Sequence, residues 1–332
     1  MSAITIDNNL VHYEVLGRGR PVILLHGWLG SWRYWIPTMQ QLSVKYRIYA
    51  LDLWGFGDTD KEPTRYSFAA QVKLLTDFMD KLGIAKAAIV GHSLGAAVGI
   101  TFARQFAERV PRVMLISPPL ADLGTLDTPV PLPASLSAPA VKPAALSSDP
   151  AATLLRNPLL NRDATSIPSP RPIQTASLNP PQPVVRQGAS NPLVALLSTL
   201  NARAMLERQM GRDAENYEKL RVEVEKMDPA YPSRSASSFV GIDLAAQLKQ
   251  LTNPVLLLHG RDDTFIEPND DVIARIAKNK PDNLFVPFIV PNFHHFPMLE
   301  HAARFNRLLG DFLDAPDLSN VQMKEQWKRQ LR

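Results

Sequence analysis

The sequence predicts an α/β protein in which a mostly parallel sheet is covered by helices on both faces. Short apolar runs alternate with segments of helical periodicity, and polar or glycine-rich residues follow directly after several of the runs. The length of 332 residues accommodates one large α/β domain or two smaller ones. The distribution of the strand and helix signals favours one core that is interrupted once.

The composition is that of an ordinary globular protein, with 45% hydrophobic and 20% charged residues. The net charge of +4 is scattered along the chain, so nothing points to a nucleic-acid partner. The absence of cysteine excludes disulfides, a thiol nucleophile and thiolate metal sites. The first residues show no secretory signal, and no apolar run approaches the roughly 20 residues that span a bilayer. We therefore expect a cytoplasmic protein without stable membrane insertion.

The first 118 residues contain the clearest alternation. Residues 4–6 and 11–16 are expected to form a hairpin around Asn8 and Asn9, because asparagine tolerates the left-handed conformation of a tight turn. Buried parallel strands are expected at 22–25, 47–52, 87–90 and 113–116. Helices are expected at 68–82, from its 3.6-residue period, and at 94–106.

The alternation stops after Pro118. Sixteen of the 75 residues from 118 to 192 are proline, and no aromatic residue lies between Phe106 and Tyr217. Proline removes backbone donors, and without aromatic side chains little surface can be buried. We therefore expect 119–192 to be a disordered Pro/Ala/Ser-rich insertion. A mobile lid or a proline-rich docking segment is the alternative.

Helical periodicity returns over 193–227, and we expect residues 193–239 to form a helical cap inserted between strands of the main sheet. The α/β pattern then resumes, with strands at 255–258 and 284–290 and helices at 270–277 and 305–313. Residues 1–118 and 240–314 would thus form the core. The tail 315–332 is short and mildly basic, and we assign it no function.

Ser93 stands in Gly91-His92-Ser93-Leu94-Gly95, between a predicted strand and a predicted helix. A serine on such a sharp turn presents its hydroxyl clear of both elements, and glycines two positions to either side avoid collisions with them. The serine needs a base, because its alkoxide is inaccessible near neutral pH. Loops at the carboxyl ends of parallel strands gather at one edge of the sheet, so the loops 26–28, 259–263 and 291–296 supply the candidate partners.

Five motifs in this order resemble the α/β-hydrolase superfamily, in the branch with a cap domain and a G-H-S-x-G nucleophile elbow. They are H-G-W at 26–28, D-L-W-G-F-G at 52–57, G-H-S-L-G at 91–95, G-R-D-D at 260–263 and H-H-F-P-M-L-E at 294–300. The resemblance covers residues 4–118 and about 240–314. It implies the α/β-hydrolase fold and the chain order nucleophile, acid, histidine.

By this resemblance Ser93 is the nucleophile, Asp263 the acid and His295 the base of a catalytic triad. Two other acids compete for the second role: Asp262, which adjoins Asp263, and Asp122, which follows an earlier strand. His294 is the competing histidine, and its expected role is structural or solvent-facing.

The backbone N–H groups of Trp28 and Leu94 occupy the superfamily's oxyanion-hole positions. His26, His92 and His259 are expected to be structural, and Asp52 to accept hydrogen bonds from a turn. Aromatic residues gather in two loops of the same edge, where core packing is expected and an apolar pocket wall is the alternative: Trp28, Trp32, Tyr34, Trp35, Trp54 and Phe56.

The resemblance implies a serine hydrolase that cleaves a small or medium apolar ester through an acyl-enzyme. It implies a small-molecule substrate and neither a cofactor nor a metal. A carbon–carbon bond hydrolase, a cofactor-free haloperoxidase and a lactonase are alternatives on the same triad. Haloalkane dehalogenases and epoxide hydrolases use Asp at the elbow, so Ser93 argues against both. A non-catalytic ligand-binding protein of this fold is the alternative from another class.

Overall fold

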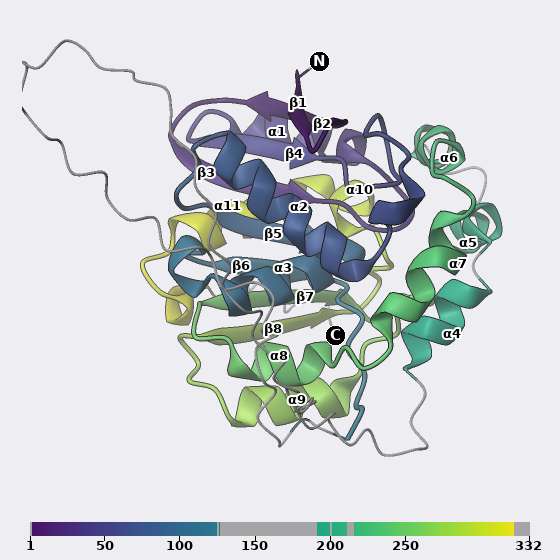
Figure 1. Cartoon of the computed structure of the whole chain (residues 1–332). Coiled ribbons are helices and arrows are strands. Elements are labelled where there is room, and N and C mark those ends of the chain that lie inside the picture. Colours follow the sequence, from purple (N-terminus) through teal and green to yellow (C-terminus); the bar gives the residue numbers. More distant parts are fainter. Residues whose placement is uncertain (1, 125, 127–190, 200, 211–215, 322–332) are drawn as a thin grey trace, which may run out of the picture. The chain divides into compact units, whose positions relative to one another are not determined.

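The core of the computed structural model, which describes residues 2–124, 126, 191–199, 201–210 and 216–321, is one mixed sheet (Figure 1). Within these residues it has eight strands in the order β1-β2-β4-β3-β5-β6-β7-β8. The strands are β1 (Ser2–Ile6), β2 (Asn9–Leu16), β3 (Arg20–Leu25), β4 (Tyr46–Leu51), β5 (Ala88–His92), β6 (Val113–Ile116), β7 (Val255–Gly260) and β8 (Phe285–Val290). β2 is antiparallel to both β1 and β4, and all other neighbours are parallel. The predicted fold class is confirmed.

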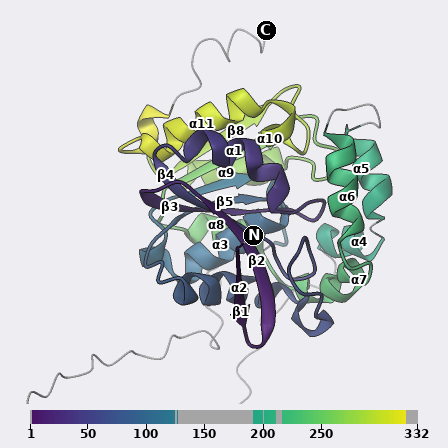
Figure 2. The same ribbon diagram turned by 90° about the horizontal axis from the view of Figure 1, so that it is seen from above.

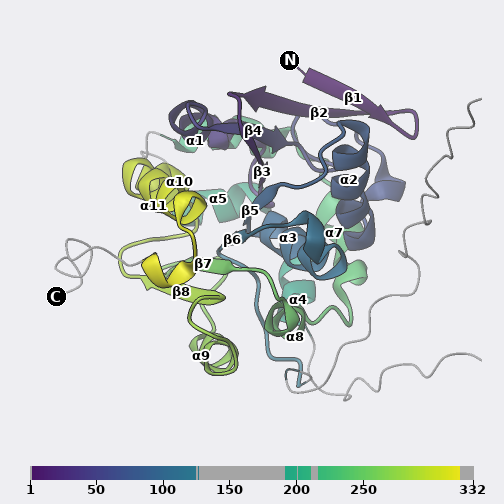
Figure 3. The same cartoon turned by 90° about the vertical axis from the view of Figure 1, so that its left-hand side faces the viewer.

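Helices cover both faces of this sheet (Figures 1 and 3). One face carries α2 (Phe68–Lys81), α3 (Leu94–Gln105) and α8 (Leu244–Gln250), and the other carries α1 (Ile36–Leu42) and α11 (Ala302–Asp314). α9 (Asp270–Lys278) packs against α8 and β8, and the single turn α10 (Pro297–Glu300) precedes α11.

Local sequence explains where these helices begin and which side they bury. Ser67 caps α2, since its hydroxyl accepts a hydrogen bond from the N–H of Ala70. Leu75 and Phe78, on the apolar stripe of α2, are fully buried against the sheet. The strands β3 and β5 to β7 are buried on both faces, as their continuous apolar runs predict.

Four short helices lie past one end of the sheet (Figure 2). We call them the cap helices: α4 (Pro192–Ser198), α5 (Ala202–Met210), α6 (Tyr217–Glu225) and α7 (Tyr231–Ala236). They adjoin loops that follow the carboxyl ends of the strands. The N–H of Asp228 donates to the Gly55 carbonyl at 3.1 Å, and the Tyr66 hydroxyl donates to the Asp228 carboxylate at 2.7 Å.

Some local predictions need correction. The hairpin turn is formed by Asp7 and Asn8, whose φ angles are 47° and 64°, and Asn9 already pairs with Ile6. The helices α1 and α8 were not expected, and α7 lies inside the expected helical cap. α1 and α7 each carry proline in the first turn, where its missing N–H is tolerated.

The predicted disorder of 119–192 falls, apart from the ends of that segment, outside the described residues. No helix in the described part of the chain is long and apolar enough to cross a membrane.

Candidate active site

Ser93 lies at a sharp turn between β5 and α3. Its φ of 55° and ψ of −110° form a conformation that residues with a side chain rarely adopt, at a cost of about 1–3 kcal/mol. The flanking positions must be glycine because a side chain at either one would collide with neighbouring backbone atoms. A Cβ on Gly91 would lie 2.3 Å from the Gly95 carbonyl oxygen, and a Cβ on Gly95 would lie 2.4 Å from the Leu25 carbonyl oxygen. The turn places Ser93 at the carboxyl edge of the sheet.

Ser93, His295 and Asp263 form one chain of hydrogen bonds. His295 Nδ1 lies 2.7 Å from Asp263 Oδ2, and His295 Nε2 lies 3.2 Å from Ser93 Oγ. Because an ionised carboxylate can only accept, Nδ1 carries the proton, and Nε2 is left to accept from the serine hydroxyl. None of the three residues exposes more than 1% of its surface.

Asp263 is held in its ionised form. Its Oδ1 accepts from the N–H groups of Phe265 and Ile266 at 2.9 and 3.0 Å. Burial raises the pKa of this carboxyl, but its interactions with His295 and with His259, whose Nε2 lies 3.5 Å from Asp263 Oδ2, outweigh burial and hold the pKa well below its usual range. The carboxylate therefore fixes one tautomer of His295.

The competing candidates have other partners. Asp262 accepts from the N–H of Asn292 at 2.7 Å, and Asp122 forms an ion pair with Arg275 at 2.6 Å. His294 is half exposed and contacts Glu300 at 3.2 Å. The structure thus brings Asp263 and His295 to Ser93, and places these alternatives in other contacts.

Leu94 and the loop that carries Trp28 both adjoin Ser93. Leu94 is the first residue of α3, so its N–H lacks a partner in the helix and lies at the positive end of the helix dipole. The loop of Trp28 touches the turn, since a Cβ on Gly27 would lie 2.7 Å from Ser93 Cβ. No hydrogen bond within the described ranges uses either N–H. Both N–H groups are therefore available as hydrogen-bond donors.

Aromatic rings from separate parts of the chain surround this site. The ring of Phe265 meets that of His295 edge-on, with centroids 4.6 Å apart. The Trp28 indole lies 6.4 Å from the Phe265 ring and 6.0 Å from that of Phe239, which follows α7. Sequence reasoning missed Phe239 and Phe265, although Phe265 stands only two residues after the predicted acid.

Five charged or polar residues join α6 to the core, and we call this contact the α6 seam. Ser31 and Arg33 both donate to Glu223, at 2.6 and 3.1 Å. Lys226 forms ion pairs with Glu223 at 3.1 Å and with Asp58 at 3.4 Å, and Arg33 also pairs with Asp58. Glu223 is only 5% exposed, so a buried carboxylate of the cap helices is neutralised by groups of the core and of α6. Sequence reasoning did not identify these residues.

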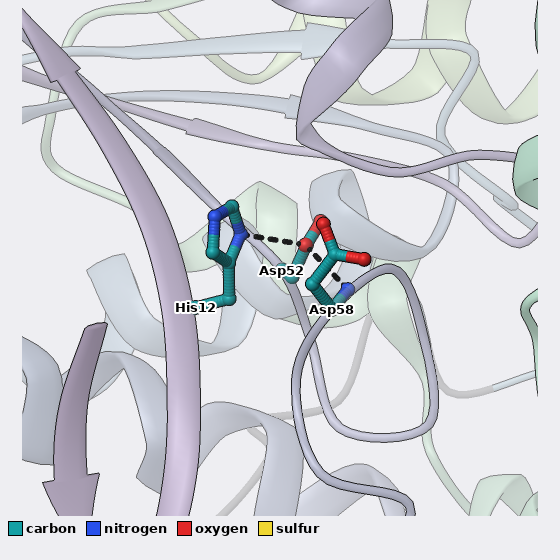
Figure 4. Close-up of side chains that lie close together, drawn as sticks. All are labelled: His12, Asp52 and Asp58. Atoms are coloured by element: carbon teal, nitrogen blue, oxygen red, sulfur yellow. Dashed lines mark hydrogen bonds and ion pairs between the residues drawn. The ribbon is translucent and has the colours of Figure 1, made fainter. Parts of the chain in front are cut away.

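His12, Asp52 and Asp58 lie close together beside this seam (Figure 4). One Asp52 oxygen accepts from His12 Nδ1 at 2.9 Å and from the N–H of Asp58 at 3.0 Å, and the other accepts from the N–H of Trp32 at 2.8 Å. The Asp58 carboxylate forms an ion pair with Arg33 at 2.9 Å. Since donors already surround the oxygens that a cation would need, the cluster is best understood as a hydrogen-bond hub that joins β2 to two loops.

The remaining buried histidines of the edge also make hydrogen bonds with the main chain. His26 accepts from the N–H of Leu53 at 3.0 Å through Nε2, and donates to the Gly27 carbonyl at 2.8 Å through Nδ1. His259 donates to the Ile266 carbonyl at 2.7 Å. These contacts are those expected of structural residues.

Comparison with known proteins agrees with this architecture. A family model described as the alpha/beta hydrolase fold matches residues 20–165. A soluble epoxide hydrolase from Corynebacterium sp. (strain C12) is 31% identical over 111 residues, which are 33% of this chain and 39% of that protein. A putative carbamate hydrolase, RutD, from Caulobacter vibrioides is 34% identical over 122 residues, which are 35% of this chain and 45% of that protein. The chain thus matches less than half the length of these relatives.

Two solved structures share the fold over nearly the whole chain. An enol-lactonase from Burkholderia xenovorans LB400 has a TM-score of 0.63 at 17% identity, covering 95% of this chain and all of that one. A meta-cleavage product hydrolase from Pseudomonas fluorescens IP01 has a TM-score of 0.62 at 22% identity, covering 95% of this chain and 97% of that one. The matching family model, the sheet order and these shared folds together show that the chain has the alpha/beta hydrolase fold.

Proposed function

We propose that this protein is a serine hydrolase that cleaves a small or medium apolar ester through an acyl-enzyme. The observation that carries the proposal is the hydrogen-bond chain from the strained Ser93 through His295 to Asp263. Serine hydroxyls acquire nucleophilicity from such a base, itself oriented by a third group. A hydrolytic role also agrees with the similar proteins, which include a soluble epoxide hydrolase and a putative carbamate hydrolase.

In this mechanism Ser93 Oγ attacks the ester carbonyl while His295 Nε2 takes the hydroxyl proton. The carbonyl oxygen becomes the anion of a tetrahedral intermediate, which the N–H groups of Trp28 and Leu94 stabilise. The C–O bond then breaks, and His295 returns the proton to the departing alcohol. Water repeats the sequence on the acyl-enzyme, releasing the acid and the free serine.

The surroundings of Ser93 favour an apolar substrate. Phe265, Trp28 and Phe239 form contacts around the site, and such rings favour hydrocarbon over charged groups. The superfamily's epoxide hydrolases use an aspartate where this chain has Ser93, so we assign ester rather than epoxide chemistry.

The test is covalent labelling by a fluorophosphonate probe, together with hydrolysis of p-nitrophenyl acetate and butyrate. Wild-type protein should be labelled and active, and Ser93→Ala should lose both properties. His295→Ala should lower kcat at least about 10³-fold. The neighbouring His294→Ala is the matched control and should retain most of the activity.

Folded wild-type protein that is neither labelled nor active would contradict the proposal and favour a ligand-binding protein. Loss of activity in His294→Ala with retention in His295→Ala would show that the base is assigned to the wrong histidine.

A further inference from the structure

Two buried side chains outside the Ser93–His295–Asp263 chain, Tyr34 and His92, connect the loops of the site. The N–H of Gly27 lies 2.7 Å from the Tyr34 hydroxyl, and that hydroxyl lies 2.9 Å from His92 Nδ1. His92 Nε2 lies 2.8 Å from the main-chain carbonyl oxygen of His295. One continuous series of hydrogen bonds therefore runs from the loop before Trp28, past the serine turn, to the loop of the histidine.

The direction of each bond follows from the groups involved. The His295 carbonyl can only accept, so His92 carries its proton on Nε2. Burial, with the charge of His295, lowers the pKa of His92 well below its ordinary 6.5, so the ring is neutral and Nδ1 accepts. Tyr34 must then donate to Nδ1, and its oxygen accepts from the N–H of Gly27. Every donor meets an acceptor.

At one end, this series fixes the peptide that carries the oxyanion donor. The Gly27 carbonyl and the Trp28 N–H belong to the same planar peptide and point in opposite directions. His26 donates to that carbonyl, and Tyr34 accepts from the preceding N–H. The peptides on both sides of Gly27 are thus held, and the direction of the Trp28 N–H is set.

There is little room for these groups to move. A Cβ on Gly27 would lie 2.7 Å from Ser93 Cβ and 3.0 Å from His92 Nδ1. The His92 ring packs on the His295 ring, with centroids 4.5 Å apart. A shift of His92 or Tyr34 would therefore be transmitted to both the histidine and the Trp28 loop.

We propose that Tyr34 and His92 are positioning residues that set the distances between the Trp28 N–H, Ser93 Oγ and the His295 imidazole. The inference rests on the proposed function, because it concerns the geometry of that reaction. Neither residue reacts with substrate. Their contribution is to hold the oxyanion donor and the base in register with the nucleophile.

The first test is Tyr34→Phe, which removes one oxygen and keeps the ring. The ring packs against Trp35 and Phe296, with centroids 4.9 and 6.2 Å away, so the variant should fold. We expect kcat for p-nitrophenyl butyrate to fall about 10- to 100-fold with little change in KM. The affinity for a trifluoromethyl ketone, which mimics the tetrahedral intermediate, should fall by a similar factor.

Tyr46→Phe is the matched control. Its ring is also buried, and its hydroxyl also makes a short hydrogen bond, 2.5 Å to Asp314, but it lies at the start of β4, away from the site. Its kcat and inhibitor affinity should remain at wild-type values, whatever it does to thermal stability.

A second pair of variants tests His92 itself. The carboxamide of His92→Gln can still donate to the His295 carbonyl and accept from Tyr34, whereas His92→Leu fills a similar volume and can do neither. Rescue of kcat in the glutamine variant relative to the leucine variant, measured on folded protein, is the expected result.

The outcomes separate this inference from the proposed function. A wild type without labelling or activity would overturn both. If the wild type is active and Tyr34→Phe matches Tyr46→Phe in kcat and inhibitor affinity, the positioning role of Tyr34 and His92 is overturned and the proposed function is not. Equal kcat in His92→Gln and His92→Leu would also overturn the positioning role. This second comparison still tests the proposal if Tyr34→Phe fails to fold.

Discussion

Gly95 and Gly99 lie about one turn apart on α3, and replacement by alanine should affect them very differently. A Cβ on Gly95 would lie 2.4 Å from the oxygen and 2.6 Å from the carbon of the Leu25 carbonyl, which is strand backbone. A Cβ on Gly99 would meet two side-chain methyl groups, Ile89 Cγ2 at 3.2 Å and Val113 Cγ1 at 4.0 Å. The helix and β3 must therefore separate for Gly95→Ala, whereas a small adjustment accommodates Gly99→Ala.

The magnitude follows from two opposing effects. Alanine stabilises a helix interior by about 1 kcal/mol relative to glycine. Because Gly95 lies in the first turn, we expect somewhat less gain there than at Gly99. Overpacking against a rigid backbone costs about 1–3 kcal/mol. We expect Gly95→Ala to be roughly 2 kcal/mol less stable than Gly99→Ala, which corresponds to a thermal midpoint about 4 °C lower for a domain of this size.

The assay is urea unfolding of both variants beside wild type, with the rate of fluorophosphonate labelling measured under native conditions. Gly95→Ala should also be labelled more slowly, since the displaced turn carries Ser93 and the Leu94 N–H. Equal unfolding free energies for the two variants would refute the packing argument, and normal labelling of a destabilised Gly95→Ala would refute its link to the site.

Two further predictions concern buried acids and their partners. Asp263→Asn should lower kcat about 10³- to 10⁴-fold, because an amide can hold His295 in the wrong tautomer, while the kcat of Asp262→Asn should stay within a few-fold of wild type. Steady-state kinetics with p-nitrophenyl butyrate measures both values, and a larger loss in Asp262→Asn would contradict the assignment of the acid. Burial lowers the pKa of His12, but the hydrogen bond and charge of Asp52 outweigh it and raise that pKa above 6.5. The stabilising effect of His12 is therefore complete below pH 6.5 and is lost as the pH rises through the raised value. The difference in unfolding free energy between wild type and His12→Gln should shrink from about pH 6 to about pH 9, and a difference that grows over this range would contradict the assignment.

Much of the core could be predicted because single-residue patterns determine it. The apolar runs of β3, β5, β6 and β7 can be buried only between covered faces, and the spacing of Gly91, Ser93 and Gly95 permits a tight strand-to-helix turn. The order of the strand-end loops then indicated which histidine and carboxylate to examine.

Other features depend on contacts that no local pattern encodes. In the sequence, Tyr34 cannot be distinguished from other aromatic core residues. Only the fold shows that its hydroxyl makes hydrogen bonds with both Gly27 and His92. Glu223 resembles any charged residue of an exposed helix, and its burial depends on Ser31 and Arg33, about 190 residues earlier in the chain. The short helices α1 and α8 were missed because each spans only seven residues, too few to show a clear helical period.

The α6 seam has a consequence for the timing of any reaction at Ser93. With none of its surface exposed, Ser93 can meet a substrate only after contacts around the site open. The seam consists of ion pairs and one hydroxyl hydrogen bond, and water can replace each of these contacts in turn. Separating the Trp28 and Phe239 rings would instead expose apolar surface to water. An opening that begins at the seam would make admission of substrate a gated event, whose frequency depends on ionic strength and is separate from the rate of bond cleavage.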